Sequence, residues 1–225
     1  MIKQASKQAS KQASNTSIIS KEFFKFLHQG AESVGVDIED KVEWKKIKDV
    51  FKRLRGTPIT AKLMKEIENP DGDVKIFAGG KTNIFTFEES IPNGNIVNIP
   101  AVLVQSRGMI DVIYYENKFT FKNEMWAYTH ENKITVKYLF YFLKTKIPQF
   151  MNIASSKGSF PQISLEVTEE LEIPNPSLEV QKYIVEILDK FHNLINDITQ
   201  GLPKEIELRE KQYIYYREKL LDFKK

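Results

Sequence analysis

Three short segments of this sequence carry residue types that could do chemistry. Asp71 and Asp73 lie close to Lys75, and two carboxylates with a lysine are typical of nuclease sites. The segment Gly79–Thr82 (Gly-Gly-Lys-Thr) is similar to part of a phosphate-binding loop, in which backbone N–H groups and a lysine hold phosphates. The segment Asn175–Pro176 is similar to the start of the Asn-Pro-Pro-aromatic motif of enzymes that methylate amino groups. Each segment needs further residues to form a working site.

None of the three segments completes its motif. The two aspartates and the lysine are crowded around one Pro-Asp-Gly turn, which is typical of a protein surface. The glycine pair lacks the spaced first glycine of a phosphate-binding loop, and Ser177 occupies the place of the second proline in the methylation motif. His28, His130 and His192 lie too far apart for metal-ligand spacing. We therefore expect no catalytic residue, no metal site and no cofactor in this chain.

The overall composition predicts a folded protein of the cytoplasm. The 225 residues are 41% hydrophobic and 12% aromatic, which supplies a core and excludes a wholly disordered chain. The absence of cysteine excludes a disulfide scaffold, a cysteine nucleophile and a thiolate zinc site. The sequence shows neither the roughly 20 consecutive apolar residues of a membrane span nor the hydrophobic centre of a signal peptide. The net charge of +3 is small, so its basic residues would have to cluster to bind nucleic acid.

The N-terminal part of the chain changes character twice. Lys-Gln-Ala-Ser is repeated three times between Lys3 and Ser14, and this polar, low-complexity pattern predicts a disordered tail over residues 1–16. Apolar residues at helical spacing then predict a helix that begins at Lys21. Between Lys41 and Arg55 we count seven basic and two acidic residues, the densest basic stretch outside the termini.

The middle of the chain alternates β-rich segments with turn residues. An amphipathic helix is expected over residues 135–146, ending before Pro148. Strands are expected at residues 74–78, 84–87, 101–105, 109–115, 118–121, 125–129 and around 163–165. Strands therefore dominate, with helices at the margins. This pattern predicts an α+β fold, with a mostly-β globular domain over residues 17–176.

Residues 177–225 carry the apolar repeat of a coiled coil. Steps of three and four residues, with one slip of phase, connect Ile184, Ile187, Phe191, Leu194, Ile198, Ile206, Tyr213, Tyr216 and Leu220. Pro203 interrupts the repeat, so the segment is either one kinked helix or two helices. An unbroken helix would be about 70 Å long and would outreach the globular domain. The pattern therefore favours pairing with a helix of another chain, with a hairpin inside the chain as the alternative.

Several segments resemble the specificity subunits of type I restriction-modification systems. The strongest likeness runs from Ile173 to Lys190, and a second helical segment from Gly201 to Leu221 is similar to the same family. Val42–Ile47, which leads into Arg55–Pro58, and Lys157–Ser164 are further points of similarity. The sequence between these segments carries no such likeness, since recognition domains of this family diverge with their DNA targets.

The resemblance implies a target recognition domain followed by a conserved spacer helix, in a subunit that does no chemistry itself. Such a subunit positions methyltransferase subunits and a motor-nuclease subunit on double-stranded DNA, and these partners use S-adenosylmethionine and ATP. Members usually carry two such units and this sequence carries one, so we expect a homodimer with antiparallel C-terminal helices that reads a two-part site. A stand-alone dimeric DNA-binding regulator is the alternative. An enzyme acting on DNA is disfavoured by the incomplete motifs.

DNA recognition needs cations for phosphates and forked or amide side chains for base edges. Arg107 is the main candidate for reading guanine, and Asn83 and Gln105 are candidates for adenine. The full predicted set is Lys52, Arg53, Arg55, Thr57, Lys81, Thr82, Asn83, Gln105, Arg107, Lys157, Ser159 and Gln162. The alternative for any one of them is a solvated surface residue, so the fold must decide which of them meet.

Overall fold

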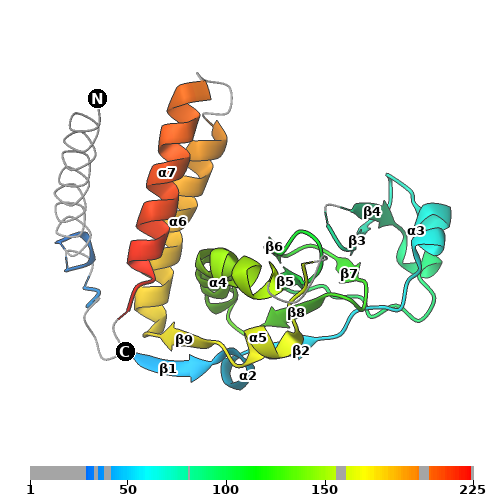
Figure 1. Ribbon diagram of the computed structural model, residues 1–225, viewed down its shortest axis with the longest axis horizontal. Coiled ribbons are helices and arrows are strands. Elements are labelled where there is room, and N and C mark those ends of the chain that lie inside the picture. The colour runs from blue at the N-terminus through cyan, green and yellow to red at the C-terminus, as the bar shows by residue number, and fades with distance from the viewer. Residues whose placement is uncertain are drawn as a thin grey trace. The chain divides into compact units, whose positions relative to one another are not determined.

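The computed structural model describes residues 29–32, 35–37, 42–80, 82–155, 161–197 and 203–223 (Figure 1). The chain divides into two compact units, residues 1–41 and 42–225, and the features below belong to the second unit. The predicted tail over residues 1–16 and the predicted helix starting at Lys21 lie outside the described residues.

Short strands and helices from distant parts of the sequence make up the second unit. In chain order they are β1 (Glu43–Lys46), α2 (Ile47–Val50), β2 (Lys52–Leu54), α3 (Ala61–Ile67), β3 (Val74–Phe77), β4 (Asn83–Thr86), the 3-10 turn η1 (Glu88–Ser90), β5 (Ala101–Gln105), β6 (Asp111–Tyr115), β7 (Phe119–Phe121), β8 (Trp126–Thr129), α4 (Lys133–Ser155), α5 (Leu165–Glu169), β9 (Glu172–Asn175), α6 (Leu178–Asp197) and α7 (Pro203–Leu220). The expected α+β class is confirmed. The strand expected around Leu165 is wrong, because Leu165 begins the short helix α5.

The strands form three small sheets. One has the order β2-β8-β5-β6 with antiparallel neighbours, and a second has the order β4-β3-β7, in which β3 and β7 are parallel. The third sheet pairs β1 with β9 and so joins two segments about 130 residues apart. This pairing brings the basic stretch of the sequence next to the segment that leads into α6.

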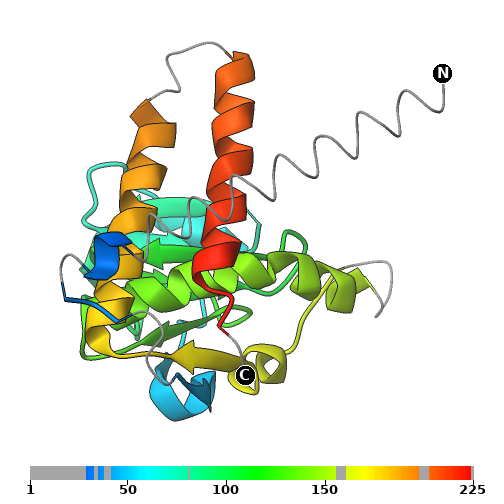
Figure 2. The same cartoon turned by 90° about the vertical axis from the view of Figure 1, so that its left-hand side faces the viewer.

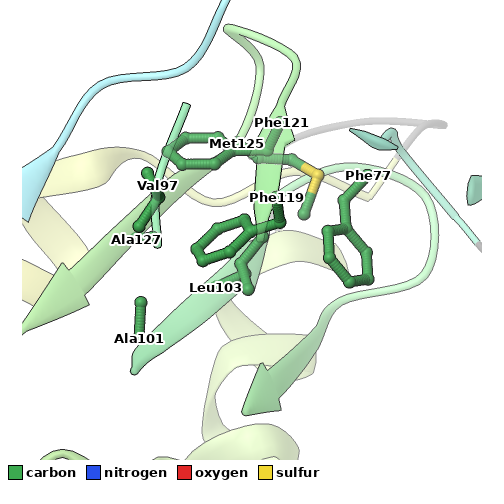
Figure 3. Packing of buried hydrophobic residues seen from close by; sticks show 8 residues of the cluster. All are labelled: Phe77, Val97, Ala101, Leu103, Phe119, Phe121, Met125 and Ala127. Carbon is green, nitrogen blue, oxygen red and sulfur yellow. The ribbon is translucent and has the colours of Figure 1, made fainter. Parts of the chain in front are cut away.

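The core lies on both sides of strand β5, and all residues of this strand are buried. On one side α4 packs against β5 and β6. On the other side Leu103 is surrounded by aromatic rings and Met125 (Figure 3). The cluster consists of Phe77, Val97, Ala101, Leu103, Phe119, Phe121, Met125 and Ala127. Burial on both faces makes β5 a rigid base for the loop that follows it.

Helix α4 continues through Pro148, so the expected end before this proline is wrong. Proline has no N–H and leaves the carbonyl of residue 144 without its helical donor. That carbonyl accepts a hydrogen bond from Arg217 Nη2 at 3.2 Å. Phe150 and Ala154, beyond the proline, are fully buried and hold the last turns in place. Tertiary contacts therefore replace what the proline removes.

Helices α6 and α7 form a hairpin, side by side in both views (Figures 1 and 2). Ser177 directly precedes α6 and caps it as expected, with its Oγ accepting from the N–H of Val180 at 3.4 Å. Pro203 is the first residue of α7, a position where its missing N–H costs nothing. The rings of Phe191 and Tyr216 stack 5.5 Å apart across the hairpin. The unbroken helix is therefore not formed, and the hairpin alternative is the one observed.

Glu170 gives the fold a pH-dependent contact. Its carboxylate accepts from Lys46 Nζ at 2.7 Å and from Lys48 Nζ at 2.5 Å. These two hydrogen bonds lower the pKa of Glu170 from 4.5 to about 2. A pKa depressed in the folded state adds stability above the unfolded pKa, and that stability is lost as the pH falls from about 4.5 to about 2.

We expect Glu170→Gln to lower the melting temperature at pH 7, with the difference from wild type shrinking as the pH falls below about 4.5. Thermal unfolding followed by circular dichroism over this pH range measures the effect. Glu131→Gln is the matched control, since Glu131 is exposed and forms no ion pair with any described residue. A difference that is constant with pH would show that the two lysine contacts do not form in solution.

Candidate nucleic-acid interface

Loops from β2, β5 and β8 and the segment before α5 enclose an open hollow of about 560 Å³. We call it the arginine groove. It is defined by three guanidinium groups and three side-chain amides, those of Arg53, Arg55, Arg107, Asn95, Asn123 and Gln162. All six residues are exposed. The groove thus presents donors in planar forks together with groups that both donate and accept, the combination that phosphates and base edges require.

Backbone pairing places Arg107 next to Gln162 in the lining of the groove. The N–H of Gly108 donates to Pro161 O at 2.9 Å, and the N–H of Ile163 donates to Ser106 O at 3.0 Å. Arg107 and Gln162 form the antiparallel pair between these two bonds. Residues in such a pair direct their side chains to the same face at close range. Two loops about 55 residues apart in sequence therefore present one guanidinium and one amide together.

Buried hydrogen bonds hold the Arg107 loop from beneath. Ser106 Oγ donates to the carbonyl of Glu124 at 2.5 Å, and the side-chain amide of Gln105 donates to the carbonyl of Gly80. Gln105 is only 4% exposed. The structure therefore places this predicted adenine reader in the interior, where it braces the loop and does not face the groove.

The two other arginines are Arg53 in strand β2 and Arg55 directly after it. Arg53 Nη1 lies 3.3 Å from Glu169 Oε1 on α5, whereas Arg55 makes no ion pair within the described ranges. Gly56 follows at a point of close approach, where a Cβ would lie 2.5 Å from the carbonyl oxygen of Phe121. Only glycine fits this turn without displacing the backbone of β7. Lys52, at the start of the strand, is exposed.

Thr57 lies beneath the groove and has no exposed surface. Its Oγ1 lies 2.7 Å from Thr120 Oγ1 and accepts from the N–H of Asn95 at 2.8 Å. Asn95 Nδ2 in turn donates to Gly56 O at 2.7 Å. Thr57 therefore positions the Asn95 loop, in contrast to the direct DNA contact that the sequence suggested.

Asn95, Asn123 and Glu124 belong to the groove but were not predicted from the sequence. Asn123 is exposed and makes no side-chain hydrogen bond with the part of the chain that the structure covers. Glu124 pairs with Lys122 at 3.0 Å. It lines both the arginine groove and a second hollow of about 550 Å³, which Gly79, Gly80, Arg107, Gly108 and Lys122 also line. Asn123 and Glu124 lie in a turn and Asn95 lies in an irregular loop, and only the fold shows that these two segments meet.

The remaining predicted contact residues lie elsewhere. Thr82 and Asn83 are exposed at the start of β4 and do not line the groove. Lys81, Lys157 and Ser159 lie outside the described residues. From the predicted set the structure thus gathers Arg53, Arg55, Arg107 and Gln162 into one hollow.

The predicted helical seam divides into two parts. Ile184, Tyr216 and Leu220 are buried within the chain, and Tyr213 is partly buried beside His192. Ile187 and Phe191 are partly buried, and Leu194 is 47% exposed. Ile198 lies outside the described residues, as does the side chain of Ile206. The hairpin therefore uses one part of the seam internally and leaves Leu194 at the surface.

Among the residues that the structure describes, no group of three or more His, Asp or Glu side chains could hold a metal ion. None of the helices that these residues form combines the length and the apolar character needed to cross a membrane.

The family model for the type I restriction modification DNA specificity domain matches residues 39–208. The chain belongs to this family. The match covers the arginine groove, α4, α6 and the beginning of α7. The resemblance seen in the sequence is therefore confirmed.

Two curated relatives place the chain further. It is 31% identical over 203 residues to the specificity subunit of the type I restriction enzymes EcoR124I and EcoR124II from Escherichia coli, a match that covers 83% of this chain and 50% of the relative. It is also 31% identical over 182 residues to the specificity subunit of the type I restriction enzyme MpnII from Mycoplasma pneumoniae, covering 79% and 52%. The chain thus spans about half the length of these curated relatives.

Solved structures show the same fold. The type I restriction-modification S subunit from M. genitalium superimposes with a TM-score of 0.55 at 18% identity, covering 73% of this chain and 43% of that one. The HsdS subunit from Thermoanaerobacter tengcongensis gives a TM-score of 0.53 at 16% identity, covering 95% and 55%. At these identities the likeness concerns the arrangement of the elements.

Proposed function

We propose that this chain is a sequence-specific DNA recognition subunit of a type I restriction-modification system. The observation that carries this proposal is the arginine groove, in which backbone pairing sets Arg107 beside Gln162. Family membership supports it, because the matched family is defined by a DNA specificity domain. A DNA substrate and the absence of cysteine both agree with a cytoplasmic location.

The side chains of the groove suggest a division of labour. Arg107 suits the O6 and N7 acceptors of guanine, which a guanidinium contacts with two parallel hydrogen bonds. Gln162, beside it, suits the N6 and N7 groups of adenine. Arg53 and Arg55, at the edge of β2, suit phosphates, whose contacts set the register of a protein on DNA. Base reading and backbone positioning would then come from different elements of one surface.

We further propose that the chain does no chemistry and that methyltransferase and motor-nuclease subunits act as its partners. Those subunits would use S-adenosylmethionine and ATP, and this chain would position them. The names of the curated relatives support a non-catalytic role, since each is a specificity subunit of a restriction enzyme. No observation on the described residues favours the stand-alone regulator.

We propose a homodimer in which the helical hairpins of two copies pair antiparallel. Leu194 on α6 is 47% exposed and Leu208 on α7 is 58% exposed, and Ile187 is partly buried on the same helix as Leu194. Covering these exposed apolar side chains with a second hairpin would remove them from water and so stabilise the dimer. A two-fold dimer would present two arginine grooves and read a two-part target with related halves.

Reconstitution with the methyltransferase subunit of the same genome tests this function. Purified chain, methyltransferase subunit or both are incubated with S-adenosylmethionine and duplex DNA, and methyl groups transferred to adenine are counted. We expect transfer only with both proteins and only at a defined sequence. Methyl transfer by this chain alone, or a methyltransferase whose target is unchanged by adding it, would contradict the proposal.

The Arg53–Glu169 ion pair competes with a phosphate contact. Glu169→Gln releases Arg53, so we expect affinity for DNA of random sequence to rise about two- to five-fold at low salt. The slope of log affinity against log salt should steepen by up to about 0.9, the value of one further phosphate contact. Titrations at several salt concentrations measure both quantities. Glu166→Gln, on the same helix, is the control because it removes the same charge. Equal effects from the two variants would show that the change in net charge, and not the release of Arg53, raises the affinity.

A further inference from the structure

The contact between α7 and α4 is built around the proline inside α4. Pro148 cannot donate to Lys144 O, and Arg217 Nη2 occupies that place from the other helix at 3.2 Å. This bond therefore depends on the sequence of both helices: a residue with an N–H at position 148 could compete for the same carbonyl. The proline leaves one backbone carbonyl of α4, that of Lys144, free to accept a hydrogen bond from α7. Helix α7 is therefore attached to α4 at one defined point.

Arg217 is held at this point despite an unfavourable environment. The residue is 9% exposed, its Nε has no hydrogen-bond partner among the described residues, and it makes no ion pair with them. Its guanidinium lies 5.5 Å from the ring centroid of Tyr213, which gives part of the compensation. A buried cation without a carboxylate is costly. An apolar residue here would pack without the cost of burying a charge. The presence of arginine therefore points to a role in positioning α7 against α4.

A second attachment joins α4 to α6. Asp189 accepts from Lys137 Nζ at 2.7 Å and from the hydroxyl of Tyr141 at 2.5 Å, and both donors lie on α4. Burial raises the pKa of Tyr141, so its hydroxyl stays a donor over the whole working range of pH. With Arg217, each helix of the hairpin has its own polar contact to α4. Two contacts on different helices fix the orientation of the hairpin relative to α4, whereas a single contact would let the hairpin rotate about it.

Helix α4 carries these contacts to the arginine groove. Lys144, whose carbonyl accepts from Arg217, also places its Nζ 2.6 Å from Asp111 Oδ1 at the start of β6. Asp111 pairs in register with Gln105, and the loop between them contains Arg107. The path from the hairpin to Arg107 thus runs through a buried strand and a helix, with no described segment of irregular chain longer than that loop.

We propose that Arg217 and Asp189 are positioning residues that set the direction in which the hairpin leaves the recognition domain, and with it the number of base pairs between the two halves of the target. The inference rests on the proposed function, because it requires a dimer that reads a two-part site. Neither residue lies in the arginine groove, so neither is expected to alter the reading of a single half-site.

The experiment measures affinity over duplexes that carry both half-sites, obtained by selection with the wild-type chain, with the spacer varied one base pair at a time. Wild type should prefer one spacer length. Arg217→Lys keeps the charge but loses the fork, and Pro148→Ala restores an N–H that competes for Lys144 O. For both variants and for Asp189→Asn, we expect the ratio of affinities between the best and next-best spacer to fall by about tenfold, or the best spacer to change.

Pro148→Ala guards against misfolding as an explanation, since it removes no packing group of the junction. Affinity for a duplex with one half-site should stay at the wild-type value in all three variants. Lys211→Ala, which changes an exposed residue of α7 paired with Glu207, should leave the spacer profile unchanged. An unaltered profile in all three junction variants overturns the inference. A wild-type chain that shows no spacer preference overturns the proposed two-part reading itself, which is a distinguishable result.

Discussion

Replacing Arg107 with alanine is expected to weaken binding to the target by about 1–3 kcal/mol for each half-site, which corresponds to about 5- to 140-fold. Arg107 is exposed and lines the groove, and its backbone is fixed by the pairing with Gln162. The paired backbone fixes the point from which the side chain starts, and the planar fork of a guanidinium is pre-organised to make two parallel hydrogen bonds to guanine. In a homodimer the loss would occur twice.

Arg107→Lys separates base reading from charge. Lysine keeps the positive charge but cannot make two parallel hydrogen bonds to one guanine. We expect this variant to bind DNA of random sequence as the wild type does and to lose preference for the target. Lys62→Ala is the control, because Lys62 lies on α3, has a side chain that is 87% exposed and does not line the groove. If Arg107→Ala weakened target and random DNA equally, Arg107 would be a phosphate contact, and guanine reading by this residue would be wrong.

Replacing Leu188 with alanine is expected to lower the free energy of unfolding by about 2–5 kcal/mol, the range for a large-to-small change in a packed core. Leu188 is fully buried on α6, a helix that packs against both α4 and α7. The deletion leaves a cavity in the buried face of α6, because the surrounding structure relaxes only in part. Denaturant unfolding followed by circular dichroism gives the change from the midpoint and slope.

Leu178→Ala on the same helix is the matched control, because the residue is 43% exposed at the first position of α6. The same chemical change there should cost less than about 1 kcal/mol. Equal losses at Leu178 and Leu188 would contradict the packing of α6 against α4 and α7.

The sequence predicted those parts of the fold whose signals are local. The β-rich segment 101–105 forms β5 as predicted, and Pro203 marks the start of α7. The path of α4 through Pro148 was not predictable, because the carbonyl that the proline frees is satisfied by Arg217, far along the chain. The same holds for β1, which pairs with β9 alone among the strands that the structure describes and whose residues carry no alternating apolar pattern.

The sequence predicted which types of residue form the site, but it predicted less well which individual residues line the groove. Arg107 and Gln162 were recognisable as polar side chains in turns, but their pairing depends on two loops that only the topology brings together. Gln105 was predicted to read adenine because its amide lies in the polar segment Gln105–Arg107, between two predicted strands. Strand β5 is buried on both faces, so Gln105 points inward. Asn123 was missed because nothing in the sequence distinguishes its turn from others at the surface.

Selection of bound duplexes from a library of random sequence tests the central claim most directly. The full chain is incubated with the library at a fixed salt concentration, bound duplexes are recovered and amplified over several rounds, and the enriched sequences are read. We expect two short enriched blocks, related by inversion, separated by a spacer of constant length and neutral sequence. Loss of guanine preference in one position of each block with Arg107→Lys would assign the contact. Recovery of duplexes with no common sequence would contradict the account.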